Sequence, residues 1–304
     1  MAVDGPGRSV VEAGRKRPDS SFFSTILLDK VSMDSAIWKR NNVKVLGSGE
    51  QTLLFAHGFG SDQNSWRFQV EAFQDRYRIV LFDHVGCGRS DFNAYSSRRY
   101  RSLRSYAEDV LELCDALKIT QCTLVGHSLS GMVGTLAAVM DPSRFRHLVF
   151  VKASPRYLND PAQDYVGGFE QSQIDALYES MAACFVSWAS GFAAAAMGNP
   201  ERPELTQEFI RTLSSMRPDI ARSVARIIFQ SDHREELPRL RTPTLILQAG
   251  EDFAVPDSVA QYMARHIPKA TLVSIPARGH LPHLSAPQAV NEALDAYLTS
   301  SAAA

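Results

Sequence analysis

Long hydrophobic runs, a strong net charge and paired cysteines are all missing from this 304-residue chain. It has no stretch of about 18 apolar residues, so we expect no segment to span a membrane. Lysine and arginine number 32, and aspartate and glutamate 33, which gives a net charge of −1. Because this balance offers no electrostatic attraction to phosphate-rich partners, we expect neither nucleic acid nor a membrane surface as a partner.

The four cysteines form no C-x-x-C pair and no cluster with histidine: they are Cys87, Cys114, Cys122 and Cys184. Zinc and redox motifs of the usual spacing are therefore excluded, and we predict no metal and no cofactor. A chain of this length does not need disulfides, which favours reduced thiols in the cytosol. Cys114 and Cys122 lie in apolar patterns and are expected in the core.

The first 40 residues differ in character from the rest. Residues 1–20 are rich in glycine, arginine, serine and proline and have no apolar centre of the signal-peptide type. They also contain Asp4, Glu12 and Asp19, whereas organelle transit peptides are poor in acidic residues. We predict a disordered or poorly ordered N-terminal extension over residues 1–40.

From residue 41 onward, strand patterns alternate with helix patterns. Apolar residues at three- and four-residue steps predict a helix over 103–117. Short runs rich in β-branched residues predict strands, the first two joined by a turn at 47–50. The predicted strands are 42–46, 52–56, 78–82, 122–125, 147–151, 243–248 and 270–275. This alternation predicts an α/β domain, a mostly parallel sheet with helices on both faces.

The alternation stops near residue 154 and resumes near residue 242. The segment between has helical patterns over 171–198, 206–216 and 218–232. We therefore predict a core of residues 41–153 and 242–300, with a helical lid inserted at 154–241. Lids of this kind lie over the C-terminal ends of the strands, where open parallel sheets bind ligands.

The strongest chemical signal is the sequence Gly126-His127-Ser128-Leu129-Ser130, between a predicted strand and a helix pattern. This context is typical of a nucleophile elbow, in which a serine occupies a sharp turn that needs small residues on both sides. Ser130 stands where glycine is usual but is also small. The alternative, an ordinary Gly-Ser turn, explains the flanking strand and helix less well.

Three further segments supply the remaining groups of the predicted active site. Residues 57–60, His-Gly-Phe-Gly, follow a strand, so the N–H groups of Phe59 and Leu129 are candidate oxyanion donors. Asp252 and His280 each follow a late strand, in the order serine, acid, histidine. We predict Ser128 as nucleophile, His280 as base and Asp252 as the acid that orients it.

Rival assignments exist at both supporting positions. Glu251 and Asp257 are alternative acids, and His283 is an alternative base. We expect the remaining lone histidines, His84, His147, His233 and His266, on the surface.

Residues 83–90 contain a G-x-G pattern that superficially suggests a phosphate loop. They lack the third glycine of a dinucleotide fingerprint and the Lys-Ser/Thr pair of a P-loop. We interpret them as a structural turn that leaves a strand, which weighs against nucleotide binding.

Together these motifs resemble the plant strigolactone and karrikin receptor hydrolases and their bacterial stress-regulator relative. The resemblance covers residues 42–298 and is greatest to the karrikin-receptor-like members and the receptor-like third clade. It rests on the segments 42–50, 57–63, 126–128, 153–157, 167–171, 216–221, 228–232 and 279–282.

The resemblance implies an α/β-hydrolase fold with a four-helix lid over a deep apolar pocket. It implies a serine hydrolase that slowly cleaves butenolide lactones or small esters, and a monomer in the cytoplasm or nucleus. In relatives, an F-box protein and a repressor dock on the lid as partners. The matching pocket positions are Phe59, Tyr157, Phe169, Trp188, Phe192, Phe229 and Ala254.

The chain departs from that family in its N-terminal extension and in two extra residues between Asn159 and Gly167. The lid aromatics also have a simpler explanation, since they could pack the lid upon itself. Two functions therefore stay open: an esterase or lactonase, and a ligand-binding receptor in which hydrolysis is incidental. A cofactor-free peroxidase reaction on the same triad is a further alternative.

Overall fold

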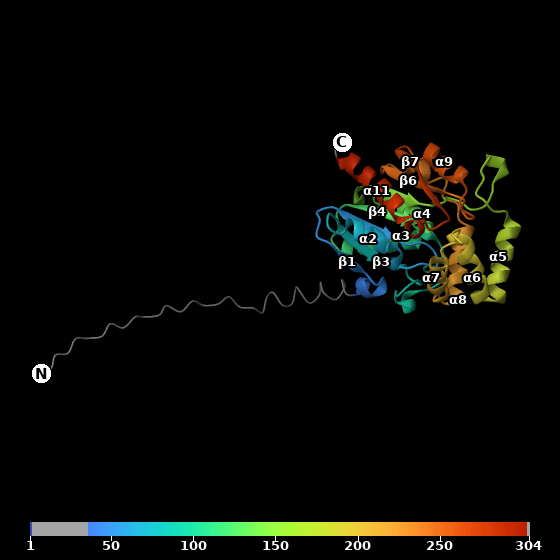
Figure 1. The fold of residues 1–304 in the computed structure, drawn as a ribbon, viewed down its shortest axis with the longest axis horizontal. Helices are drawn as coiled ribbons and strands as arrows, with labels where there is room; N and C mark the ends of the chain where they lie inside the picture. Colours follow the sequence, from blue (N-terminus) through green and yellow to red (C-terminus); the bar gives the residue numbers. More distant parts are fainter. Residues whose placement is uncertain (2–35, 303–304) are drawn as a thin grey trace.

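The computed structural model describes Met1 and residues 36–302. These residues form a seven-stranded sheet in the order β1-β3-β2-β4-β5-β6-β7. Figure 1 shows the sheet with helices around it. β1 runs antiparallel to β3, and every other neighbouring pair is parallel. The strands are β1 (Lys44–Leu46), β2 (Thr52–Ala56), β3 (Arg78–Phe82), β4 (Cys122–His127), β5 (Phe145–Val151), β6 (Thr244–Gly250) and β7 (Ala270–Arg278).

Alternation along the strands builds an apolar layer on each face of the sheet. Leu54 belongs to one buried cluster, whereas its neighbours Leu53 and Phe55 belong to the other. Helices α3 (Leu103–Ala116), α4 (Leu129–Met140) and α9 (Asp257–His266) cover the first face. Helices α2 (Arg67–Phe73) and α11 (Pro287–Ala302) cover the second. Because both faces are covered, the central strands are apolar on both sides, as parallel sheets require.

The predicted strands and the helix over 103–117 are present, with small changes at their ends. The pairing of the first two strands is different from a hairpin. β1 and β2 do not pair with each other; each pairs with β3. The connection passes closely over the residues before β3, where a Cβ atom on Gly47 would clash with the Tyr77 carbonyl oxygen. The segment 47–50, which the sequence predicts as a turn between neighbouring strands, therefore carries the chain across β3 from β1 to β2.

The lid consists of four helices between β5 and β6: α5 (Gln171–Ala183), α6 (Phe185–Met197), α7 (Pro203–Ser214) and α8 (Pro218–Phe229). The Ala-rich stretch predicted over 171–198 is two helices, because Cys184 adopts an extended backbone with φ −155° and ψ 97°. Figure 1 shows the four helices gathered on one side of the sheet. The helical insertion predicted at 154–241 corresponds to this part of the fold.

The predicted N-terminal extension is too long by a few residues. Residues 36–40 are helical, and Arg40 forms a 3.4 Å ion pair with Asp109 of α3. The rest of the prediction, residues 2–35, lies outside the described residues. In the described part of the chain, no helix has both the length and the apolar character needed to cross a membrane.

Replacing leucine by alanine should change the free energy of unfolding by very different amounts at a buried and at an exposed position of the sheet. Leu124 of β4 is fully buried, whereas Leu272 of β7 is 37% exposed. We expect Leu124→Ala to lower the free energy of unfolding by about 2–5 kcal/mol and Leu272→Ala by less than about 1 kcal/mol. Urea titration monitored by circular dichroism measures both. Equal losses would contradict the assignment of Leu124 to the core.

Candidate active site

Ser128 lies between β4 and α4 in a strained backbone conformation, with φ 55° and ψ −121°. Non-glycine residues rarely adopt a positive φ, and the conformation persists only where the surroundings enforce it. Here the Ser128 N–H donates to the Val151 carbonyl at 2.9 Å, and the Ser128 carbonyl accepts from Gly131 at 3.0 Å. A Cβ atom on Gly126 would lie 2.5 Å from the Ser130 carbonyl oxygen, so the turn closes only over glycine. The predicted elbow is thus present in the structure.

Three side chains that are distant in sequence meet at this elbow. His280 Nε2 lies 2.8 Å from Ser128 Oγ, and His280 Nδ1 lies 2.8 Å from Asp252 Oδ2. Asp252 comes from the loop after β6 and His280 from the loop after β7. The rival groups lie elsewhere: Asp257 accepts a hydrogen bond from Gln248, and His283 stacks on Trp66.

The charge of Asp252 is stabilised although its side chain is fully buried. Burial raises the pKa of a carboxyl group, but here His280, Lys152 and the Ala254 N–H together lower the pKa of Asp252 below its usual value. The Ala254 N–H donates to Oδ1 at 2.8 Å, and the Lys152 ammonium lies 3.3 Å from Oδ2. The ionised carboxylate can therefore hold the Nδ1–H tautomer of His280.

The two candidate oxyanion donors belong to residues beside Ser128: Phe59 lines the same small cavity, and Leu129 is the next residue in the chain. Phe59 follows β2, and Leu129 is the first residue of α4. Within the described residues, neither N–H group donates a backbone hydrogen bond in a turn or loop. The N–H group of Leu129, at the start of α4, is suited to stabilise developing negative charge.

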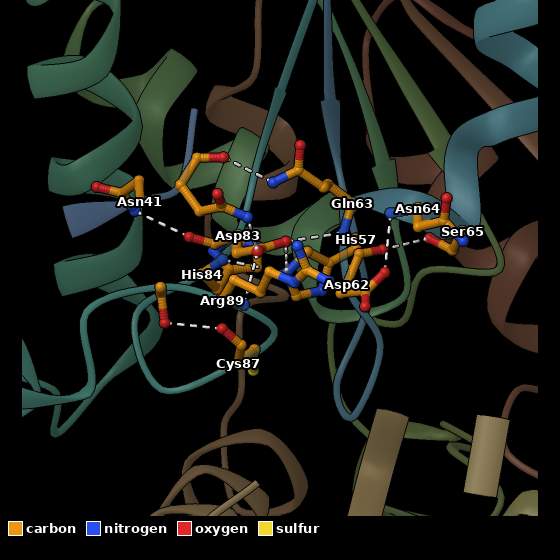
Figure 2. A network of polar contacts seen from close by, with 12 residues as sticks. Asn41, His57, Asp62, Gln63, Asn64, Ser65, Asp83, His84, Cys87 and Arg89 are labelled. Carbon is orange, nitrogen blue, oxygen red and sulfur yellow. Dashed lines mark hydrogen bonds and ion pairs between the residues drawn. The ribbon is translucent and has the colours of Figure 1, made fainter. Parts of the chain in front are cut away.

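A buried carboxylate fixes the loop that carries Phe59. Asp83, just after β3, accepts hydrogen bonds from the backbone of Gln63 and Arg89, both at 2.8 Å (Figure 2). The Asn42 side chain donates to the same carboxylate at 2.7 Å. These bonds join the loop after β2 to the turn at 83–90. The turn at 83–90 thus surrounds the carboxylate of Asp83. This negative charge is consistent with a structural role, and it would repel a phosphate group.

Ser130 replaces the glycine that is usual in the elbow, and its hydroxyl group has a structural role. Its side chain is fully buried and donates to the His57 carbonyl at 2.6 Å. The same oxygen lies 2.7 Å from His84 Nε2, which must then donate the proton. Ser130 therefore ties the elbow to the loops after β2 and β3.

The expectation of surface histidines was wrong for His84 and His147, which are 2% and 7% exposed. His233 is partly buried, and His266 is exposed as expected. Burial lowers the pKa of His84 and of His127 well below the usual value. His127 Nε2 donates to the His280 carbonyl at 2.8 Å, a contact that sequence reasoning missed. The only sequence signal was the position of His127 beside the nucleophile.

The cavity beside Ser128 is apolar but small, with a volume of about 20 Å³. That is room for about one water molecule, so the deep pocket implied by the resemblance is nearly closed in this structure. Its lining residues are Phe59, His127, Ser128, Tyr157, Phe192, Phe209, Ile228, Phe229, Ala254 and His280.

Five of the seven predicted pocket positions line the cavity, and Phe169 and Trp188 lie behind them. The Trp188 ring is 5.0 Å from Phe192, and the Phe169 ring is 5.9 Å from Phe229. Sequence reasoning missed Phe209 and Ile228, whose helical spacing was visible but equally typical of lid packing. The aromatics therefore serve both purposes: some line the cavity and others support them.

Tyr157 brings a second hydroxyl close to Ser128, the candidate nucleophile. Its oxygen lies 3.3 Å from Ser128 Oγ, and burial raises the pKa of Tyr157. The phenol thus stays protonated and can hydrogen-bond Ser128 or a bound ligand. Among the described residues, no group of three or more histidine, cysteine, aspartate or glutamate side chains is arranged to hold a metal ion.

Comparison with known proteins matches the model of the alpha/beta hydrolase fold family to residues 51–287. The karrikin insensitive 2 receptor CA of Petunia hybrida is 45% identical, over 82% of this chain and 92% of that protein. The strigolactone esterase RMS3 of Pisum sativum is 42% identical, over 88% of this chain and 100% of that protein. A hydrolase from Oleispira antarctica has a solved structure with a TM-score of 0.85 at 35% identity, covering 88% of this chain and 97% of its own. These relatives confirm the resemblance that the motifs indicated.

The buried histidines predict loss of stability in mild acid. Burial lowers the pKa of His283 to about 3 from 6.5. Between these values only the unfolded chain binds the proton, so the free energy of unfolding falls as the pH falls, by about 1.4 kcal/mol per pH unit for each such group. We expect His283→Phe, which keeps the stacking on Trp66, to flatten the slope by about that amount.

The exposed His266 provides the matched control, as His266→Phe should leave the slope unchanged. Urea titrations between pH 4 and pH 7 measure the slope. A slope that His283→Phe leaves unaltered would show that His283 is not the group that titrates.

Proposed function

Because the chain belongs to the alpha/beta hydrolase family, in the group of karrikin receptors and strigolactone esterases, we propose that it hydrolyses small apolar esters or lactones through Ser128, His280 and Asp252. One observation carries the proposal: the two 2.8 Å contacts that join Ser128 Oγ to His280 and His280 to the buried Asp252. A nucleophile, a base and an orienting acid are thereby aligned at the strained elbow.

The proposed reaction proceeds in two steps. Ser128 Oγ attacks the substrate carbonyl while His280 Nε2 accepts its proton, and the N–H groups of Phe59 and Leu129 stabilise the oxyanion. His280 then gives the proton to the leaving oxygen, which leaves an acyl group on Ser128. Water activated by His280 releases the acid and restores the serine.

The cavity favours a flat, apolar acyl group. Five of its ten lining residues are phenylalanine or tyrosine, and the Tyr157 hydroxyl adds a polar group 3.3 Å from Ser128 Oγ, besides His280. The names of the relatives and the resemblance of the motifs point to butenolide lactones as the substrate class. Because the cavity of about 20 Å³ is too small for such a ring, phenylalanine side chains of the lid have to move aside before binding. This opening is a physical reason for a slow turnover.

Loss of the nucleophile should abolish the reaction. We expect Ser128→Ala to reduce the release of fluorophore from a fluorogenic butenolide by about 10³-fold or more, because the acyl intermediate cannot form. Ser190→Ala is the control, since the Ser190 hydroxyl only bonds Val186 within α6. Intact-protein mass spectrometry should detect an adduct on Ser128 or His280 of the unaltered chain and none on Ser128→Ala. Equal turnover of the two serine variants would assign the chemistry to another group.

A second function, ligand-dependent signalling, is favoured by contacts between the lid and the catalytic loop. The His280 N–H donates to the Ala196 carbonyl near the end of α6 at 2.7 Å. The Asn199 side chain, just after α6, donates to the carbonyls of Met197 and Arg278, at 2.6 and 3.3 Å. A ligand that displaces His280 therefore also disturbs α6. We propose that such a change lets an F-box protein and a repressor dock on the lid.

This receptor function predicts ligand-dependent association. In a pull-down with purified F-box protein, we expect binding only when the butenolide is present. Substitution of Asn199 by alanine removes a contact between lid and loop and should alter the ligand concentration required. No association at any ligand concentration would leave the hydrolase proposal alone.

A further inference from the structure

Lys152 occupies an unusual position directly behind the catalytic acid. It follows the last residue of β5 and has a φ of 52°, in the region that favours glycine. Its side chain has no exposed surface. Lysine is rarely fully buried, and the left-handed backbone adds a further cost. Both costs fall on one residue, so its contacts must compensate for them.

The ammonium group of Lys152 is fully satisfied inside the protein. Nζ donates to the Ala249 carbonyl at 2.8 Å and to the Val255 carbonyl at 3.1 Å, and it lies 3.3 Å from Asp252 Oδ2. Three acceptors match the three protons of an ammonium group, whereas a neutral amine has only two. Burial lowers the pKa of Lys152, and the carboxylates of Asp252 and Asp257 oppose that change. The hydrogen bonds are those of a charged lysine.

Lys152 and His280 use the same carboxylate oxygen. Asp252 Oδ2 accepts from His280 Nδ1 at 2.8 Å and faces Lys152 Nζ at 3.3 Å, while Oδ1 is occupied by the Ala254 N–H. When His280 takes the proton of Ser128, two cations compete for one negative charge. The attraction that would stabilise the imidazolium is thereby weakened.

We propose that Lys152 is a positioning residue that acts through Asp252 and limits how strongly Asp252 stabilises the protonated form of His280. Lys152 would then set both the rate of the serine chemistry and the pH at which it begins. The other ionisable groups near the site are Asp257 at the start of α9, Tyr157 from the β5–α5 connection, and His127 and His283, whose pKa values burial lowers. This inference rests on the proposed serine chemistry.

Removing the lysine charge tests the inference. We expect Lys152→Met and Lys152→Gly to shift the acid limb of the pH–rate profile to higher pH by about 1 unit, because the imidazolium is then better stabilised. At the plateau, kcat should rise by about 3- to 10-fold with KM unchanged. Lys152→Gly also relieves the left-handed backbone, and water can occupy the site of Nζ. Labelling of Ser128 by a fluorophosphonate probe, measured from pH 5 to pH 9, gives the profile without a known substrate.

Lys118 is a matched control, because it also has a left-handed backbone, with a φ of 53°, but is exposed. Lys118→Met and Lys118→Gly should have the same pH–rate profile as the unaltered chain. Thermal melting of every variant separates loss of folding from loss of reactivity. A purely structural role of Lys152 predicts slower labelling with an unmoved midpoint.

The outcomes distinguish the two proposals. If the unaltered chain neither reacts with the probe nor hydrolyses p-nitrophenyl acetate, the proposed serine chemistry fails. If the unaltered chain reacts and folded Lys152 variants keep its midpoint, the inference about Lys152 is overturned alone. Failure of both Lys152 variants to fold would also overturn it, because Lys152 would then be a determinant of the fold.

Discussion

The strained backbone of Ser128 is the constraint on which the rest of the site depends. A positive φ lifts the serine out of the line of β4 and presents its hydroxyl at the edge of the sheet. The conformation holds because the neighbouring chain is fitted to it, with glycine at position 126 and a buried hydroxyl at Ser130. The strain is thus maintained by packing and presents the Ser128 hydroxyl to His280.

Near the turn at Ser128, Asp252 and Lys152 form an ion pair, whereas the neighbouring rings of His127 and His283 are neutral. Burial keeps His127 and His283 neutral, whereas Asp252 stays charged because three donors surround it. Two neutral imidazole rings beside His280 are consistent with proton transfer confined to Ser128 and His280. Phe192, Phe209 and Phe229 of the helical insertion line the cavity beside Ser128, which has room for about one water molecule. A molecule larger than water therefore reaches Ser128 only when these lid side chains move.

Much of the fold was predictable from short-range patterns. Short apolar runs, five of them rich in β-branched residues, located all seven strands, because each strand carries its own apolar signature. The pairing of β1 with β3 could not be predicted, since a turn sequence does not reveal which distant strand fills the space beside it. The division of the lid at Cys184 also escaped prediction, because apolar spacing continues through the break.

By itself, the sequence determined the chemical groups: Ser128, Asp252 and His280 were identifiable because each follows a strand whose C-terminal end lies at one edge of a parallel sheet. Only the tertiary structure decided their surroundings. Lys152 is 100 positions before Asp252, and nothing in its local sequence indicates that its ammonium group meets that carboxylate. Burial of His84 and closure of the cavity likewise depend on contacts between distant segments, which local patterns do not encode.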